Sequence, residues 1–386
     1  MKSKGNTIVQ LADYGGPYSG NFIASLKMLS AKLNDIGWRQ VFIFSDIAED
    51  KGWLQDLIKS NHQIYFLPRN KSKITLGKDI YHIVKKEKAS ILHSHFSTFD
   101  MPSVVAKFLR QFDGENVHCI RHVHSAFPVK QTINRRLKDI VKFRITGKYV
   151  HSIYVSDAIM DSDVDRGLNK ATATLLGNGI DIDRQSNASE TRERLLNKYQ
   201  IQETNNNLLL FGWDPITKGV DITLKACLKL AGDDKKFNLI IIGEEKLNQY
   251  VDIFFSGDIP AWLKVLGPEE NVSNLYQIAD IFISSSRYEG FSYAVLEAMV
   301  RGLPIVSSDI LGLIWAREAP LVDFFISENI SNLSDVLQKL MQTDALERKR
   351  MFADNLDFVI NKYSMQKWTD KLLDIYSNAI KGDESF

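Results

Sequence analysis

The chain alternates short apolar runs with longer amphipathic segments, and it does so in two separate series. The apolar runs of the first series lie at residues 7–12, 41–45, 64–67, 91–95, 118–123 and 152–155. Those of the second series lie at 207–212, 237–243, 262–267, 281–285 and 304–308. Runs of this length, separated by helix-length segments such as 21–36, are typical of parallel strands joined by crossover helices. The sequence therefore predicts an α/β fold of two doubly wound parallel-sheet domains, each binding ligands at the carboxyl ends of its strands.

The length of the chain also favours two domains, because a single hydrophobic core rarely serves more than about 250–300 residues and this chain has 386. The polar stretch 183–190 has the composition of a linker. We therefore expect a first domain at 1–185 and a second at 186–364. The last segment, 365–386, has the apolar spacing of an amphipathic helix.

Composition excludes several classes of protein. Lys plus Arg total 48 against 47 for Asp plus Glu, so the balance of charge gives no indication of nucleic-acid binding, and 44% hydrophobic residues exclude a disordered chain. Cys119 and Cys227 lie far apart within apolar runs, which favours reduced, buried thiols. The polar first six residues do not resemble a signal peptide, and no apolar stretch has the length of a membrane span. We expect a cytoplasmic protein.

Two carboxylates near the end of the second series are the strongest sign of a ligand site. Glu289 follows the apolar run 281–283, and Glu297 comes about two helical turns later. The turn between them is formed by Gly290, Phe291 and Ser292. Free amides at the start of a helix can hold a phosphate, and ionised carboxylates accept hydrogen bonds from sugar hydroxyls. The segment therefore predicts a site for a nucleoside diphosphate sugar.

This segment resembles the E-x7-E signature of the family 4 retaining glycosyltransferases, which have the GT-B fold of two Rossmann-like domains facing a central cleft. The likeness extends over most of the chain. The segment 211–219 resembles the family's G-R-x-x-x-x-K-G loop, in which an arginine and a lysine neutralise the donor diphosphate. Lys218 matches the lysine, whereas Trp213 stands at the arginine position. Arg287 is one candidate to replace the missing cation, and a surface arginine is the alternative. The resemblance also implies that the final helix returns to the first domain.

In the first domain, Gly15 and Gly16 separate the first strand from the first helix and would allow close approach to phosphate or sugar. A plain tight turn is the alternative. The motifs His93-Ser94-His95 and His122-Val123-His124 end two strands. No Cys, Asp or Glu lies nearby at ligand spacing, so we expect no metal. The resemblance implies that His124 lies beside the donor sugar and that His95 is structural. His122 is expected to be a hydrogen-bonded core histidine.

A basic stretch follows the His124 strand, with Asp139 as its only acidic residue. Its cations are Lys130, Arg135, Arg136, Lys138, Lys142, Arg144 and Lys148. Such a cluster could attract an anionic membrane surface or a pyrophosphate-linked acceptor, and a solvated helix face is the alternative.

Taken with the resemblance, these residues predict a retaining, metal-independent glycosyltransferase. It would move a sugar from a nucleoside diphosphate sugar to a hydroxyl of a glycan or lipid-linked glycan in surface polysaccharide synthesis, at or near the inner face of the membrane. No cofactor other than the donor substrate is expected. His124, Lys218 and Glu289 would be catalytic. Donor contacts would come from Gly15, Gly16, Arg287, Gly290, Phe291, Ser292 and Glu297.

Two alternatives from other classes exist. The arginine position filled by Trp213 suggests a non-catalytic partner subunit with the same fold. A nicotinamide-dependent oxidoreductase also uses paired α/β units, but the chain lacks G-x-G-x-x-G followed by an acidic residue at a strand end.

Overall fold

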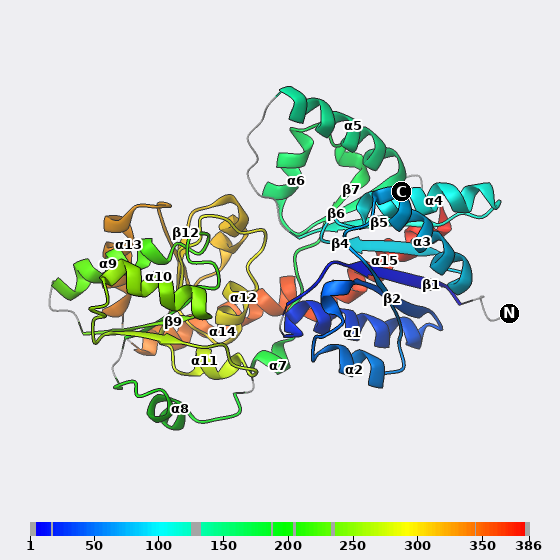
Figure 1. Ribbon diagram of the computed structural model, residues 1–386. Coiled ribbons are helices and arrows are strands. Elements are labelled where there is room, and N and C mark those ends of the chain that lie inside the picture. The colour runs from blue at the N-terminus through cyan, green and yellow to red at the C-terminus, as the bar shows by residue number, and fades with distance from the viewer. Residues whose placement is uncertain are drawn as a thin grey trace. The chain divides into compact units, whose positions relative to one another are not determined.

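The computed structural model describes residues 5–16, 18–124, 133–186, 188–203, 206–232, 236–343 and 345–382 (Figure 1). The chain divides into two compact units. Unit 1 comprises residues 1–179 and 365–386, and unit 2 comprises residues 180–364. Each unit is a wholly parallel sheet flanked by helices, as the two series of apolar runs predicted.

Unit 1 is built on a seven-stranded sheet with the order β3-β2-β1-β4-β5-β6-β7. The strands are β1 (Thr7–Ala12), β2 (Arg39–Ser45), β3 (Gln63–Leu67), β4 (Ile91–His95), β5 (His118–Val123), β6 (Val150–Tyr154) and β7 (Ala173–Leu175). The helices are α1 (Gly20–Asp35), α2 (Leu54–Lys59), α3 (Lys73–Glu87), α4 (Asp100–Phe112), α5 (Ile133–Tyr149), α6 (Asp157–Val164) and α15 (Met365–Lys381), with short 3₁₀ turns η1 (Asp46–Ala48) and η2 (Lys170–Thr172).

Unit 2 has a six-stranded sheet with the order β10-β9-β8-β11-β12-β13. Its strands are β8 (Asn207–Phe211), β9 (Asn238–Ile242), β10 (Leu263–Leu266), β11 (Ile281–Ser284), β12 (Ile305–Ser308) and β13 (Val322–Phe325). Its helices are α7 (Ile182–Ser186), α8 (Arg192–Lys198), α9 (Val220–Gly232), α10 (Glu245–Phe255), α11 (Ser273–Gln277), α12 (Tyr293–Val300), α13 (Ile330–Met341) and α14 (Ala345–Tyr363), and η3 (Leu311–Glu318) is a 3₁₀ turn.

Both faces of the unit 1 sheet are buried, because neighbouring residues of each strand pack into different cores. Val9 packs on one face in a core with residues of α3 and α4, whereas Ile8 packs on the other face with α15. Trp368 and Leu372 belong to this second core. Strands buried on both faces read as continuous apolar runs, which is why the sequence revealed them.

The chain passes between the units at two adjacent points. Ile180 forms a parallel bridge with Ser364, and its amide donates to the carbonyl of Tyr363 over 2.8 Å. Residues 180–185, expected in the first domain, thus belong to unit 2, and α7 occupies part of the expected linker. None of the helices in the described ranges combines the length and apolar character that a membrane span needs.

Candidate functional site

Two loops of unit 2 carry most of the residues singled out in the sequence. One follows β8 and the other follows β11, and these strands are neighbours in the sheet, pairing Leu210 with Ile283. Both loops therefore lie at the carboxyl edge of the sheet, where open α/β sheets bind ligands.

Lys218 and Glu289 meet across these two loops. The Lys218 Nζ donates to Glu289 Oε1 over 2.5 Å, and the Ser286 hydroxyl donates to the same oxygen over 2.8 Å. The lysine side chain is 24% exposed and the glutamate 13%. A cation and a carboxylate that remain partly open to solvent can both contact a phosphorylated sugar.

Gly219 allows the first loop to approach the second. Its φ is +63°, and a Cβ added there would lie 2.0 Å from the Ser285 carbonyl oxygen. The Ser285 hydroxyl lies within hydrogen-bond distance of the Lys218 and Gly219 carbonyls, at 2.9 and 3.0 Å, and Thr223 donates to the same hydroxyl. The backbone on either side of Lys218 is therefore held against the end of β11.

Arg287 holds the same two loops together through its guanidinium. It forms a two-pronged ion pair with Asp221, at 2.8 and 2.9 Å, and donates to the Ile216 carbonyl over 2.7 Å. Its Nε contacts Glu328 over 3.2 Å. Hydrogen bonding to Arg287 lowers the pKa of the Asp221 carboxyl, although burial opposes this shift. The arginine considered as a replacement cation is thus engaged by protein acceptors.

The helix expected near residue 291 begins at Tyr293, and Ser292 is its N-cap. The Ser292 hydroxyl accepts from the Val295 amide. Gly290 and Phe291 are buried, and the Phe291 ring stacks on Trp315 at 4.2 Å and 12°. The stacking fixes the turn that carries Glu289 into the helix. The partial positive charge of the helix start favours an anion there.

Glu297 lies on the inner side of α12 and is only 8% exposed. Its Oε2 accepts from the Tyr276 hydroxyl over 2.7 Å, and the same hydroxyl contacts the Ala294 carbonyl. Burial raises the pKa of Tyr276 well above its usual value, and the neighbouring Glu297 carboxylate raises it further. A ribose bound by Glu297 would share this carboxylate with Tyr276.

Trp213 stands just beyond β8, at the position where the family carries an arginine. The residue is 42% exposed, and its ring lies nearly parallel to that of Phe211, 6° apart. Lys246, on α10, contacts Asp214 in the same loop over 3.4 Å. The loop therefore presents the flat Trp213 ring at the position where the resembled family loop has an arginine guanidinium.

In unit 1, the loop after β1 packs tightly. The Gly16 carbonyl accepts from the Trp53 indole over 2.9 Å, and a Cβ on Gly15 would lie 2.8 Å from the Ile47 side chain. A Cβ on Gly16 would meet the Tyr14 hydroxyl at 2.7 Å. Close packing therefore disfavours any larger residue at Gly15 or Gly16, in addition to the predicted ligand role of both glycines.

His124 follows β5 at the carboxyl edge of the unit 1 sheet. Its Nε2 lies 3.0 Å from His95 Nδ1, and Phe96 stacks on its ring at 4.8 Å. Burial lowers the pKa of His124 to about 4, while a hydrogen bond with Asn178 acts in the opposite direction. His124 is therefore neutral at pH 7. It belongs to unit 1, whereas Lys218 and Glu289 belong to unit 2.

The basic stretch falls largely on α5. Lys130 lies outside the described residues, as do the side chains of Arg135 and Arg136. Lys138, Arg144 and Lys148 are exposed. Lys142 is partly buried, and burial, followed by nearby Arg121, lowers its pKa. Asp139 is buried and pairs with Arg166 at 2.9 Å. The cations of α5 are thus divided between solvent and the interior of unit 1.

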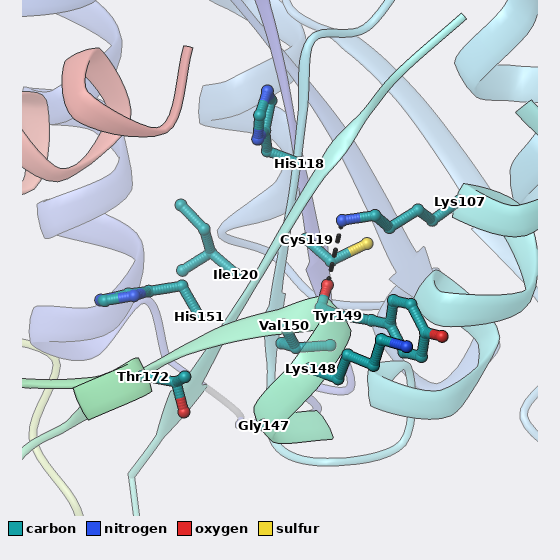
Figure 2. Close-up of a pocket in the computed structure, with 10 residues that line it drawn as sticks. All are labelled: Lys107, His118, Cys119, Ile120, Gly147, Lys148, Tyr149, Val150, His151 and Thr172. Atoms are coloured by element: carbon teal, nitrogen blue, oxygen red, sulfur yellow. Dashed lines mark hydrogen bonds between the residues drawn. The ribbon is translucent and has the colours of Figure 1, made fainter. Parts of the chain in front are cut away.

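A small pocket of about 50 Å³ opens elsewhere in unit 1 (Figure 2). Its lining includes His118 and His151, near the amino ends of β5 and β6, and Lys107, which donates to the Tyr149 carbonyl over 3.2 Å. Ligands of parallel α/β sheets bind at the opposite, carboxyl ends. The pocket is therefore not our candidate site.

Comparisons with known proteins relate both units to glycosyltransferase families. The family model for glycosyl transferases group 1 matches residues 191–356, and the model for Glycosyltransferase Family 4 matches residues 41–184. The chain belongs to the family 4 glycosyltransferases. The matched residues of the two models fall mainly in unit 2 and unit 1, respectively.

Several relatives carry related names. The chain is 22% identical over 362 residues to the Escherichia coli UDP-Gal:alpha-D-GlcNAc-diphosphoundecaprenol alpha-1,3-galactosyltransferase, covering 86% of this chain and 88% of that protein. It is 26% identical over 218 residues to the lipopolysaccharide glucosyltransferase WaaG of E. coli K12, covering 54% and 56%.

Solved structures agree on the fold of this family 4 glycosyltransferase. A glycosyltransferase from Rickettsia africae superposes with a TM-score of 0.80 at 18% identity, covering 98% of this chain and 99% of that one. Anabaena HepE, solved in complex with UDP, gives 0.79 at 14%, covering 96% and 100%. The fold is GT-B, as the sequence predicted.

Proposed function

We propose that the protein is a retaining, metal-independent transferase that moves a sugar from a nucleoside diphosphate sugar to a hydroxyl of a glycan or lipid-linked glycan. The observation that carries the proposal is the meeting of Lys218 and Glu289 at the carboxyl edge of the unit 2 sheet, followed by the start of α12. The Lys218 ammonium group suits the diphosphate, and the Glu289 carboxylate suits the sugar hydroxyls.

The family relatives support the donor and acceptor classes. The E. coli relative is named for a UDP-Gal donor and a diphosphoundecaprenol acceptor, and HepE has been solved with UDP and with UDP-glucose. These names favour a nucleoside diphosphate sugar here and an acceptor used in surface polysaccharide synthesis. A binding screen against nucleoside diphosphate sugars would identify the base and the sugar.

In this proposal, Lys218 and the amides at the start of α12 stabilise negative charge on the departing diphosphate. Fixed charges and dipoles of this kind usually supply the largest catalytic contribution. Glu289 accepts hydrogen bonds from the donor sugar and Glu297 from the ribose. Because Arg287 is held by Asp221, we assign it to positioning the Lys218 loop.

His124 is proposed to orient the donor sugar as positive charge develops on its anomeric carbon. Its neutral ring at pH 7 suits that role, because a cationic imidazolium would oppose the charge. The departing phosphate would take the acceptor proton, and attack would come from the face that the diphosphate leaves.

We further propose that α5 approaches an anionic membrane surface from outside. Lys138, Arg144 and Lys148 are exposed, and so are the apolar side chains of Ile140 and Val141. Cations beside exposed apolar residues are the combination that holds peripheral helices at lipid headgroups. Such contact would place the enzyme at the cytoplasmic face, where lipid-linked acceptors are found.

The alternative of a non-catalytic partner subunit rests on Trp213, because an inert relative could lose the phosphate arginine without penalty. Nucleotide release separates the two functions. The wild-type protein, incubated with a panel of nucleoside diphosphate sugars, should release the free nucleotide from one of them, whereas an inert partner should release none.

The site itself is tested by Lys218→Ala and Glu289→Ala. Each should lower kcat/KM by about 10²-fold or more, since removing a preorganised electrostatic contact costs about that factor. Lys229→Ala is the matched control, because Lys229 is an exposed lysine on α9 that pairs only at the surface with Asp335. Circular dichroism should show all three variants folded. Wild-type rates in either site variant would remove Lys218 or Glu289 from the mechanism.

A further inference from the structure

Three histidines gather beneath the carboxyl edge of the unit 1 sheet. His93 and His95 lie two residues apart on β4, so their side chains project from the same face. His122, on the neighbouring strand β5, is the direct partner of His95 in the parallel register. The fold thus brings together two motifs separated by almost thirty residues of sequence.

The cluster is compact and fully enclosed. One ring nitrogen from each of His93, His95 and His122 can be chosen so that the three atoms lie within 4.8 Å of one another. All three residues are buried. Burial, the largest cause, lowers the pKa of each ring well below its usual value, and the other histidines lower it further. A neutral imidazole has one nitrogen lone pair that can bind a metal ion.

Several of these nitrogens have no hydrogen-bond partner among the described residues. They are His93 Nε2 and both ring nitrogens of His122. Leaving a buried polar atom without a partner costs about 1–3 kcal/mol, so such atoms in a folded protein call for an explanation such as an ion. Three such nitrogens lie together in this one enclosed cluster.

The remaining nitrogens of His93 and His95 are held from outside the cluster. His95 Nδ1 lies 3.0 Å from His124 Nε2, so an ion bound at this nitrogen would replace that contact. The Tyr376 hydroxyl, on α15, lies 2.6 Å from His93 Nδ1. The Gln10 side-chain oxygen lies 2.9 Å from His95 Nε2, and the Gln10 amide donates to Tyr376 over 3.0 Å. Metal-binding histidines nearly always have their second nitrogen fixed by such a partner, which sets the tautomer and the ring orientation.

We propose that His93, His95 and His122 form a binding site for one divalent transition metal ion, with Zn²⁺ as the best fit. Three neutral imidazoles suit Zn²⁺, whereas Mg²⁺ and Ca²⁺ require oxygen ligands. Zinc bonds to nitrogen at roughly 2.0–2.1 Å, which places tetrahedral ligand atoms about 3.4 Å apart. The ligand atoms, which lie within 4.8 Å of one another, therefore need to close by up to about 1.4 Å on binding.

The proposed ion would be structural. It would join β4 to β5 and, through His93 and Tyr376, attach α15 to the sheet. Its ligands include His95, which contacts His124, but zinc retention and nucleotide release are measured separately, so this site and the proposed function can fail independently. The sequence suggested no metal because no Cys, Asp or Glu stands at ligand spacing from either histidine pair, and because the sequence does not state the register between β4 and β5.

The test uses full-length protein stripped with a chelator and then dialysed against zinc sulfate. The wild type should retain about one equivalent of zinc by plasma mass spectrometry, and cobalt substitution should give visible absorption bands of a four- or five-coordinate site. His122→Thr and His93→Gln should each retain less than a tenth of an equivalent. His82→Gln is the control, because His82 is an exposed histidine on α3 and should bind like the wild type.

A second measurement does not depend on the variants folding well. Zinc at about a thousand times its Kd should raise the Tm of the stripped wild type by about 8 °C or more, by linkage between binding and folding. The same addition should leave the Tm of His122→Thr unchanged. A wild type that retains no zinc and shows no rise in Tm would overturn the proposal, as would equal binding by His122→Thr and the wild type.

Discussion

Replacing Gly219 with alanine tests whether the backbone of the Lys218 loop is as tightly constrained as the structure indicates. The change adds one methyl group and alters no charge. At a φ of +63°, an alanine costs about 1–2 kcal/mol relative to glycine. Its Cβ would also lie 2.0 Å from the Ser285 carbonyl oxygen, which is far inside any real contact, so one loop must move.

That movement would disturb the hydrogen bonds from Ser285 to the carbonyls of Lys218 and Gly219. The hydroxyl has one proton to share between them, so together they are worth about 1 kcal/mol net, and the total loss is about 2–3 kcal/mol. For a unit of this size, that corresponds to a fall in Tm of about 4–12 °C. Because Lys218 moves with its neighbour, donor binding should weaken as well.

Gly232→Ala is a matched control at the other end of the same helix, α9. Nothing lies within 4 Å of a Cβ added at Gly232, and its φ is not in the left-handed range. Alanine there should be neutral or stabilise by up to about 1 kcal/mol. Differential scanning calorimetry and titration with the donor would measure both variants. An unchanged Tm and donor affinity for Gly219→Ala would refute the constraint that we assign to this loop.

Two other substitutions examine the charges around the same loop. Arg287→Ala should lower the free energy of unfolding by about 1–3 kcal/mol near pH 7, because it leaves the partly buried Asp221 carboxylate without its main partner. Since Arg287 lowers the Asp221 pKa, this contribution is present above the ordinary Asp pKa of about 3.9 and fades as pH falls below it. Urea titrations that find an equal loss at pH 3 and pH 7 would argue against the ion pair. Trp213→Arg should tighten donor binding about tenfold, since a charge-assisted contact to phosphate is worth about 1.5 kcal/mol or more. Unchanged or weaker binding in calorimetry would mean that residue 213 does not face the diphosphate.

Most of the fold could be predicted from the sequence because parallel strands buried on both faces appear as apolar runs. β1, β4 and β5 have the predicted bounds, and the other predicted strands differ by one or two residues at their ends. The structure adds β7 and β13, which the sequence did not indicate. Both are short edge strands without a fully buried run, so neither has the pattern on which the prediction depended.

The site was only partly accessible from the sequence. The turn at Gly290 and the start of α12 follow from local residue order, and there the prediction was within two residues. The ion pair between Lys218 and Glu289 depends on which strands are neighbours in the sheet, which the sequence does not state. The ion pair between Arg287 and Asp221 depends on the same strand order, so the sequence did not show that this arginine is bound by a protein carboxylate.

The return of α15 to unit 1 has a consequence for the order in which the protein forms. Unit 2 is one uninterrupted segment of chain, so a ribosome releases all of it before α15 emerges. The sheet of unit 1, although synthesised first, exposes Ile8, Ile91 and the Gln10 side chain until Trp368 and Tyr376 arrive to cover them. The sheet of unit 1 can therefore be completed only after α15 is synthesised, and a nascent chain that stops before residue 365 would expose an uncovered apolar sheet to chaperones and proteases.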